Sequence, residues 1–571
     1  MSTNGDGFLK PGAQTPVGGM TDVDIHLKDW DHAGPRSVGS REDILTAEQQ
    51  QQQDESQYVT GTKLVLIVAA LYASIFLVAL DRTIIATAVP KISSYFHALD
   101  DIGWYASAYL LTSCATQLLW GRIYTFYSTK LMFLISILLF EVGSAVCGAA
   151  PTSTGFIIGR AIAGIGSAGI SSGSTVIVTQ ILPLQKRPAI VGGVGSMFGI
   201  SSIIGPLLGG AFTDHVSWRW CFYINLPIGA IVLAILVPFL NVPQRKLVER
   251  DSSVSRQLIR LDPVGTALFL PSVICFLLAL QWGGSQYQWN SARIIALFVL
   301  AGVLMIAFTG VQVWRQEDAT IPPRIAKQRS IAFGAVFSGV IGAGLISILY
   351  ALPIWFQAIK GRTAVQSGID TIPLVLSLVV GTIMSGIIIS RTGYYIPFMF
   401  ISCIFLSIGS GLITTFKVST GHQAWIGYQV IFGLGLGFGM QQPSLAAQNV
   451  LDQKDISTGV SLMFFAQSLG GAVFVCVSQS VFNNFLRKGL LSVLSPADAA
   501  KVIFTGATEL SRVVSPDKLP DVLLAYNYAL YKAFIVSLAV SCFLVVPTLG
   551  MEWRRIPQTK PEAKGAEKLE G

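Results

Sequence analysis

Four charged residues stand inside long apolar stretches of this sequence, where an unpaired charge is energetically costly. Asp81 and Arg82 are adjacent, Glu141 lies in L-L-F-E-V-G-S, and Arg160 begins R-A-I-A-G-I-G-S-A-G. A carboxylate in such a place is protonated, paired or in contact with water, so it is able to take up and release a proton. We therefore expect these four residues to be candidates for proton coupling or substrate binding. A structural ion pair or snorkelling to the membrane surface is the alternative.

A second pattern combines glycines with a proline, in G-I-S-S-I-I-G-P-L-L-G-G from Gly199 to Gly210. The glycines allow a neighbouring helix to approach closely, and the proline removes one backbone hydrogen bond and bends the helix. A bent, closely packed helix suits a conformational change, and static packing is the alternative. The candidate residues of this motif are Gly199, Gly205, Pro206, Gly209 and Gly210.

Uncharged polar residues replace charges in the apolar stretches of the second half. Four glutamines are candidates to line a substrate cavity: Gln357, Gln429, Gln441 and Gln467. Aromatic residues such as Trp355 and Phe464 accompany them. A cavity of this kind suits a bulky, amphipathic, mostly uncharged ligand. Hydrogen bonds between helices are the alternative role for each glutamine.

These residues lie on about fourteen apolar stretches, most of them roughly 20 residues long, which is the length that crosses a bilayer as a helix. The sequence therefore predicts an all-α polytopic membrane protein. The expected spans are 64–88, 103–121, 130–149, 155–182, 188–212, 220–240, 263–282, 292–314, 331–357, 366–389, 395–416, 424–447, 458–482 and 529–551.

Composition agrees with this class. Of 571 residues, 52% are hydrophobic and 12% charged, and the net charge of +8 is expected to reside in loops rather than to bind nucleic acid. The sequence contains no G-x-x-x-x-G-K-[ST] and no H-E-x-x-H, so ATP-driven transport and zinc chemistry lack support. We expect no catalytic residue, metal or cofactor. The seven cysteines are expected to be apolar packing residues.

Loop charges predict the orientation. With a cytoplasmic N-terminus, the inner loops hold about fifteen Lys and Arg and the short outer loops about six. An even number of spans then places the C-terminus on the same side.

The expected organisation has two related halves. Its segments are a disordered cytoplasmic tail 1–60, a first six-helix bundle 61–240, a cytoplasmic linker 241–262, two additional helices 263–314, a second six-helix bundle 315–552 with an extracytoplasmic loop 483–528, and a cytoplasmic tail 553–571. The turns at Gly121–Lys130 and Gly386–Tyr395 occupy the same ordinal place in each half and suggest an internal repeat.

Together, four motifs resemble the major facilitator superfamily, in particular its fourteen-span drug:proton antiporter branch and fungal toxin and multidrug efflux pumps within it. L-D-R-T-I-I-A-T-A-V-P-K-I resembles the first-span motif, and R-A-I-A-G-I-G-S-A-G the fourth-span motif, whose arginine is implicated in proton coupling. G-I-S-S-I-I-G-P-L-L-G-G is similar to the antiporter motif of span five. G-R-I-Y-T-F-Y-S-T-K matches only in part, because Thr125 stands where the family usually has an acidic residue.

The resemblance implies a major facilitator fold with 14 transmembrane helices in a 6+2+6 arrangement. It implies proton-coupled efflux of small amphipathic molecules such as toxins, secondary metabolites or drugs, by alternating access. The expected partners are the substrate, protons and the bilayer, with the protein as a monomer. The plasma membrane is expected, with the vacuolar membrane as the alternative. An importer of a siderophore or nutrient, a transporter-like sensor and a membrane enzyme remain as rival functions.

Overall fold

The computed structural model describes residues 58–98, 101–241, 260–284, 286–505 and 510–557. The chain divides into two units, Met1–Ser56 and Gln57–Gly571, and the described helices belong to the second. The predicted N-terminal tail up to residue 57, residues 242–259 of the predicted linker and residues 558–571 of the C-terminal tail lie outside the described residues.

Helices make up the regular secondary structure of the described chain, apart from two isolated bridges. The first group of helices is α2 (Gly61–Phe96), α3 (Ile102–Phe126), α4 (Thr129–Ala149), α5 (Ser153–Ile181), α6 (Arg187–His215), α7 (Trp220–Tyr223) and α8 (Asn225–Phe239). A hairpin follows, formed by α10 (Pro263–Trp282) and α11 (Ala292–Arg315), then η1 (Gln316–Asp318) and α12 (Pro323–Ala326).

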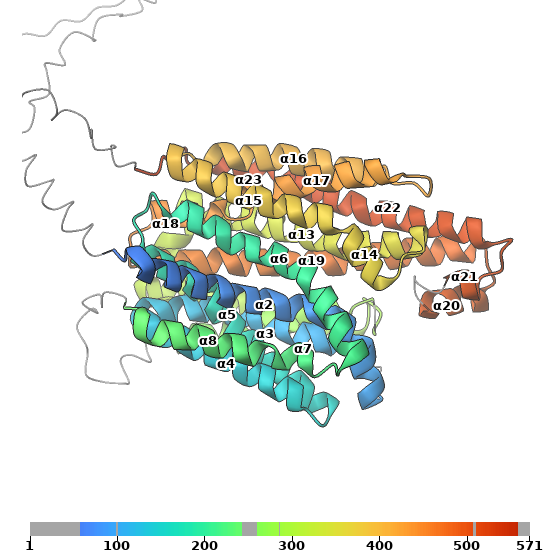
Figure 1. Ribbon diagram of the computed structural model, residues 1–571, viewed down its shortest axis with the longest axis horizontal. Helices are drawn as coiled ribbons and strands as arrows, with labels where there is room; N and C mark the ends of the chain where they lie inside the picture. The colour runs from blue at the N-terminus through green and yellow to red at the C-terminus, as the bar shows by residue number, and fades with distance from the viewer. Residues whose placement is uncertain (1–57, 99–100, 242–259, 285, 506–509, 558–571) are drawn as a thin grey trace, which may run out of the picture. The chain divides into compact units, whose positions relative to one another are not determined.

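The second group contains α13 (Arg329–Lys360), α14 (Ala364–Asp370), α15 (Ile372–Thr392), α16 (Ile396–Thr414), α17 (His422–Gly439), α18 (Gln442–Val450), α19 (Ile456–Leu491), α20 (Pro496–Thr505), α21 (Leu510–Val513), α22 (Leu519–Phe543) and α23 (Val545–Gly550). Figure 1 shows the long helices of both groups running side by side.

Local sequence explains where many of these helices begin and end. The Thr152 side chain accepts a hydrogen bond from the N–H of Gly155 and so caps α5. Thr363 and Gln366 form a capping box at the start of α14. Gly361 and Gly393 follow α13 and α15 with φ of 61° and 79°, a backbone conformation in which glycine lacks the steric penalty of other residues.

Twelve helical segments of the described chain are long and apolar enough to cross a membrane. The predicted spans 103–121 and 424–447 are not among them. The first corresponds to α3, which is long enough but carries several buried polar side chains, including Gln117 and Thr116. The second is divided between α17 and α18. Polar residues and a helix break therefore separate these two segments from the apolar pattern of the other twelve.

The helix ends meet at two opposite levels, which we name from α2. The Gly61 end is where α2 begins, and the Phe96 end is where it finishes. Because successive long helices alternate in direction, α3, α5, α8, α11 and α15 finish at the Gly61 end, while α6, α13 and α19 begin there. Tyr394 forms an isolated bridge with Arg555 at this end.

The two groups contain matching helix pairs. In the first group α2 packs on α6, α3 on α5, and α4 on α5. In the second, α13 packs on α19, α15 on α17, and α16 on α17. Between the groups, α3 packs on α19 and α15 on α6. The second helix of each group thus contacts the fifth helix of the other, as a repeated unit would require.

The turns proposed as an internal repeat lie at these two contacts. A Cβ on Gly121 would lie 2.7 Å from the Cβ of Ser461 on α19. A Cβ on Gly386 would lie 2.6 Å from the carbonyl oxygen of Pro188 on α6. Each glycine is therefore needed for the close approach of a helix from the other group, at the Gly61 end.

The α10–α11 hairpin packs against both groups. Phe269 of α10 contacts the Phe465 ring of α19 at 5.3 Å between centroids and the Phe308 ring of α11 at 5.0 Å. Leu111 and Leu118 of α3 belong to the same apolar cluster. The hairpin therefore covers the line where α3 and α19 meet.

Asp262 fastens the hairpin at the Gly61 end. Its carboxylate accepts hydrogen bonds of 2.9 Å from the Gly265 N–H, 2.8 Å from the Gln312 amide, and 2.9 Å from both the N–H and the hydroxyl of Thr320. Burial alone raises the pKa of this carboxyl, but these hydrogen bonds outweigh burial and lower the pKa below its ordinary value. The start of α10, the end of α11 and the chain after η1 are thereby held together.

The segment 483–528, predicted as a loop, is largely helical in its described part. α19 continues to Leu491, α20 and α21 follow, and α22 begins at Leu519. Apolar side chains from this segment, including Leu494, Val502 and Val514, pack onto the core of the second group. Amphipathic helices bury one face against a domain without forming an apolar run, so a search for apolar runs does not detect them.

Candidate functional site

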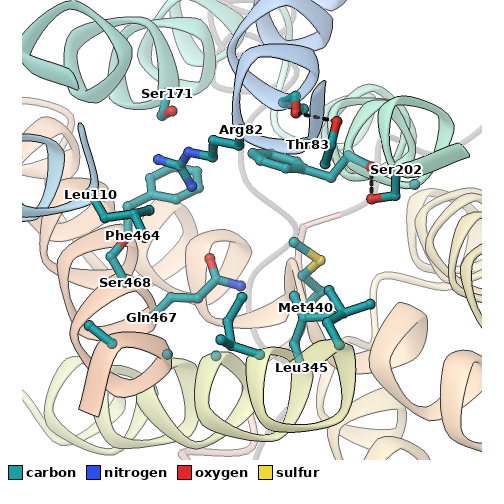
Figure 2. Close-up of a pocket in the computed structure, with 18 of the residues that line it drawn as sticks. Arg82, Thr83, Leu110, Ser171, Ser202, Leu345, Met440, Phe464, Gln467 and Ser468 are labelled. Atoms are coloured by element: carbon teal, nitrogen blue, oxygen red, sulfur yellow. Dashed lines mark hydrogen bonds between the residues drawn. The ribbon is translucent and has the colours of Figure 1, made fainter. Parts of the chain in front are cut away.

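A cavity of about 340 Å³ lies between the two groups of helices. Its walls come from α2, α3, α5 and α6 on one side and from α13, α15 and α19 on the other, with Met440 following α17. The lining is mainly apolar, with aromatic rings at Phe198 and Phe464. Figure 2 shows Arg82 and Gln467 reaching into the open space from different helices.

Helical spacing explains which residues reach this cavity. On α19, Phe464, Ser468, Gly471 and Val475 recur every three or four residues, so they share one helix face. On α3, Leu110, Ser113 and Gln117 have the same spacing. This periodicity was available in the sequence and would have identified Ser113 and Gln117, which the search for charges and for second-half glutamines missed.

Arg82 faces the cavity and contacts few polar groups. Its guanidinium donates to the Ser113 hydroxyl at 3.2 Å and lies 5.4 Å from the centre of the Tyr109 ring. The Nε of Arg82 is buried and has no hydrogen-bond partner among the described residues. Because Arg82 is among the residues that line the cavity, its guanidinium is available to a bound molecule.

Asp81 points away from the cavity and pairs with Arg160. The Arg160 Nη1 donates to the Asp81 carboxylate at 2.5 Å, and both side chains are almost fully buried, with exposures of 1% and 0%. The Arg160 Nε donates to the Tyr105 carbonyl oxygen at 2.9 Å, and its guanidinium lies 4.5 Å from the centre of the Tyr109 ring. Arg160 thus does not snorkel to the surface.

Asn225 extends this buried polar group. Its side-chain amide donates to the Ser144 hydroxyl at 3.1 Å and lies 3.5 Å from the second oxygen of the Asp81 carboxylate. It begins α8, and sequence reasoning did not identify it because a single asparagine at a helix start has many ordinary roles.

Glu141 lies behind the pair rather than on the cavity wall. Both of its carboxylate oxygens are buried and have no hydrogen-bond partner among the described residues. The carboxyl packs against Gly229 of α8, where a Cβ would overlap it. The structure thus brings Asp81, Arg160 and Asn225 together, with Glu141 apart from the cavity lining.

Of the four glutamines proposed for the cavity, only Gln467 is among the described lining residues. Gln357 donates to the Ser367 hydroxyl at 3.0 Å, and Gln429 to the Asp370 carbonyl oxygen at 3.0 Å, so both connect helices. Gln441 lies against Gly195 of α6, where the two groups meet.

The glycine motif of α6 divides into two contacts. A Cβ on Gly209 would lie 2.8 Å from the Ile84 carbonyl oxygen of α2, and Gly205 faces Thr83 of the same helix. Gly199 instead faces α15, where a Cβ would lie 3.3 Å from the Val375 carbonyl oxygen. Gly210 has room, with its nearest neighbour, Val365, 3.9 Å from an added Cβ.

Pro206 is the interior proline of α6 and stands between these contacts. A Cβ on Gly368 of α14 would lie 3.8 Å from the Pro206 ring. α6 therefore touches α2 within its own group and α14 and α15 in the other group.

The groups meet closely at the Gly61 end. Ser390 of α15 donates to the Gln185 carbonyl oxygen at 2.5 Å, and Ser461 of α19 donates to the Ser172 hydroxyl at 3.1 Å. Thr125 lies 3.5 Å, oxygen to oxygen, from Thr458. Because Thr125 is uncharged, this crossing uses hydroxyls where an acidic residue was expected from the resemblance.

No cluster of three or more His, Cys, Asp or Glu side chains that could hold a metal occurs within the described residues.

Comparisons with known proteins agree with the family that the sequence motifs resemble. Residues 71–475 match the family model of the Major Facilitator Superfamily. The chain is 57% identical over 504 residues to the rubrofusarin-specific efflux pump aurT of Gibberella zeae, covering 88% of this chain and 92% of that protein. It is 47% identical over 508 residues to the efflux pump aflT of Aspergillus parasiticus, covering 89% of this chain and 99% of that protein.

A solved structure has the same fold. The human organic anion transporter MFSD10 matches with a TM-score of 0.57 and 14% identity, covering 86% of this chain and all of that one. At this identity the match concerns the fold alone.

Proposed function

This chain belongs to the major facilitator superfamily, and we propose that it exports small amphipathic molecules in exchange for protons. It is a multi-pass membrane efflux transporter, since it aligns with the efflux pumps aurT and aflT over nearly their whole length. Those relatives favour export over the import of a nutrient or siderophore. We take the exported molecules to be toxins, secondary metabolites or drugs.

The observation that carries the proposal is the position of the cavity beside the buried ion pair. Arg82 lines the cavity, and its sequence neighbour Asp81, which is not among the described lining residues, is paired with Arg160. A proton that binds Asp81 neutralises its carboxylate and removes the attraction to Arg160. Substrate at Arg82 and a proton at Asp81 would then act on adjacent residues of one helix, which is a direct basis for exchange.

Glu141 is the third coupling candidate. Its carboxylate is buried behind the pair without a hydrogen-bond partner among the described residues, so its charged form is unsupported there. We propose that it holds a proton in at least one stage of the cycle.

Alternating access would use the α6 motif. Gly199, Gly205 and Gly209 allow α6 to pack closely against both groups, and Pro206 lies among these contacts with Gly210, which has room. We propose that the Gly61 end is cytoplasmic, as the loop charges predict, and that the contacts there keep the cytoplasmic side closed.

We also propose fourteen spans in a 6+2+6 arrangement, adding α3 and α17–α18 to the twelve apolar helices. The bundles would be 61–240 and 315–552, with 263–314 as two additional helices. Support comes from the matching helix pairs of the two groups. A monomer in the plasma membrane is the simplest working unit for this plan.

The test is efflux of a panel of fluorescent amphipathic compounds from cells that express the protein, with and without a protonophore. Export that stops with the protonophore and in Asp81→Asn supports proton exchange. Asp214→Asn is a matched control, because Asp214 is exposed and pairs only loosely with Lys91, at 3.8 Å. Export that continues in Asp81→Asn and with the protonophore contradicts proton coupling, and uptake in place of export contradicts the direction.

A further inference from the structure

The charge of the cavity is concentrated in one residue. Among the described lining residues, Arg82 is the only ionisable side chain. The remaining polar lining consists of hydroxyls and two amides, Gln117 and Gln467. A ligand in this space therefore meets a single cation and no carboxylate on the wall.

The nearest carboxylate in sequence does not neutralise this cation. Asp81 is committed to Arg160 at 2.5 Å. Arg82 itself makes no ion pair among the described residues, and one of its donors, Nε, is buried without a partner. A half-buried guanidinium in a mainly apolar space is stabilised by any oxygen that accepts its hydrogen bonds.

The surroundings of the Tyr109 ring have the same excess of positive charge. Its ring lies 5.4 Å from the Arg82 guanidinium and 4.5 Å from that of Arg160. Two guanidiniums and one carboxylate, that of Asp81, thus surround one ring. The next carboxyl, Glu141, packs against Gly229 of α8, which contributes no residue to the described lining.

The other walls favour flat aromatic molecules. Phe198 and Phe464 lie on different groups of helices, and leucine, isoleucine and valine side chains fill most of the surface between them. A volume of about 340 Å³ is at the small end of the range for drug-sized ligands. Gln117 donates to Ser172, so Gln467 is the amide that Figure 2 shows turned into the open space.

We infer that this cavity selects planar aromatic molecules that carry an acidic or anionic oxygen, such as a phenolate, an enolate or a carboxylate, which Arg82 binds. The inference rests on the proposed export function and narrows its substrate class. A lipophilic cation would face the uncompensated guanidinium with no carboxylate on the described wall, so it is disfavoured at this site.

The test compares three probes with one ring system: anthracene-2-carboxylate, its methyl ester, and an anthracenylmethyl trimethylammonium ion. Binding to the purified full-length protein in nanodiscs is measured by anthracene fluorescence. A charge-assisted hydrogen bond corresponds to an affinity gain of about ten- to a hundredfold. We expect the carboxylate to bind that much more tightly than the ester, and the cation to bind most weakly.

Variants assign the preference to its residue. Arg82→Gln removes the charge and should bring the ratio of carboxylate to ester affinity close to one, while Arg82→Lys should retain part of the preference. Phe464→Leu should weaken all three probes without changing their order. Arg293→Gln removes an exposed cation outside the cavity, whose partner is Tyr287, and should leave the wild-type ratio.

The wild-type ranking is informative even if Arg82→Gln does not fold. Equal binding of the three probes, preference for the cation, or a carboxylate preference that survives in Arg82→Gln overturns the inference. Cells that export the cation and not the carboxylate would overturn it while leaving the export function intact. Cells that export none of the probes and none of the amphipathic panel contradict both.

Discussion

Asp81 and Arg160 form an ion pair from which neither charge can be removed alone without leaving the other buried and unpaired. Their side chains are 0% and 1% exposed. Loss of one partner of a buried pair typically destabilises a protein by about 3–5 kcal/mol. The pair therefore contributes to folding as well as being the proposed coupling site, and experiments have to separate the two contributions.

A double-mutant cycle separates them. Asp81→Asn alone should lower the unfolding temperature strongly, because Arg160 keeps its charge with only the Tyr105 carbonyl and aromatic rings as partners. Adding Arg160→Gln should recover part of that loss, with a coupling of about 1–3 kcal/mol. The measurement is thermal unfolding of the purified variants in one detergent. Additive losses would mean that the pair does not act as a unit.

Sequence reasoning was informative for charges and weak for neutral polar residues. A charge in an apolar run has to be paired, wet or near the surface, so Asp81, Arg82, Glu141 and Arg160 could be selected from type and place alone. Their partners could not, since Asp81 and Arg160 are 79 positions apart. The side-chain amide of a glutamine finds hydrogen-bond partners equally well between helices or in a cavity. Gln357 and Gln429 therefore resemble Gln467 in sequence, although they connect helices instead.

At the scale of helices, two neighbouring glycines of α6 differ in their surroundings. An added methyl group at Gly209 would meet the Ile84 backbone at 2.8 Å, whereas one at Gly210 would have only ordinary contact, at 3.9 Å from Val365. Position in the motif alone does not distinguish them.

Gly209→Ala should therefore separate α6 from α2, lower the unfolding temperature and reduce export severely. Gly210→Ala should be tolerated. Alanine has a higher helix propensity than glycine by up to about 1 kcal/mol, and this gain offsets a small loss in packing. Thermal unfolding and efflux of the same probe are measured for both variants. Equal damage by the two substitutions would contradict the packing described for this motif.

The hydrogen bonds to the Asp262 carboxylate, which hold the α10–α11 hairpin, predict that the stability of the protein depends on pH. The folded-state pKa of Asp262 is lowered, so the stabilisation by its carboxylate is present above the unfolded-state pKa of about 3.9 and is lost as pH falls through the folded-state value. Asparagine keeps the αL backbone available at this position, where φ is 51°.

Asp262→Asn should therefore lower the unfolding temperature at pH 7, and the difference from wild type should shrink as the pH falls below about 4. Unfolding is followed in buffers from pH 7 downward. Asp214→Asn, at an exposed position, should show little difference at any pH. A difference for Asp262→Asn that stays constant in acid would assign the effect to packing rather than charge.

At the scale of the whole molecule, the groups cross at α3–α19 and α6–α15. The alternation of apolar runs and turns predicted the order of the helices, because each run has to cross the bilayer and return. It could not predict which helices meet across the groups. That depends on the close approach of Gly121 to Ser461 and of Gly386 to Pro188. In each case the neighbour lies in the other half of the sequence.

A cross-link tests whether these crossings open during transport. In a background without the native cysteines, Thr125→Cys with Thr458→Cys should form a disulfide, since the two hydroxyl oxygens are 3.5 Å apart. Oxidation should stop export and a reductant should restore it. The control is Asp101→Cys with Ser153→Cys, which should remain active. In the native protein the Ser153 hydroxyl donates a hydrogen bond of 2.5 Å to the Asp101 carboxylate within one group. Full activity of the oxidised Thr125–Thr458 pair would contradict opening at this end.

The α10–α11 hairpin shields one of the two lines of contact between the groups from lipid and leaves the other accessible. Amphipathic molecules concentrate in the bilayer before any transporter meets them. On one flank α10, with Phe269 against Phe465, covers the α3–α19 contact. Within the described residues, the hairpin has no comparable packing on α6 or α15. We expect lateral entry from the bilayer to be one-sided, so photoreactive groups on lipid-facing α15 should capture a membrane-dissolved substrate, and those on α10 should not.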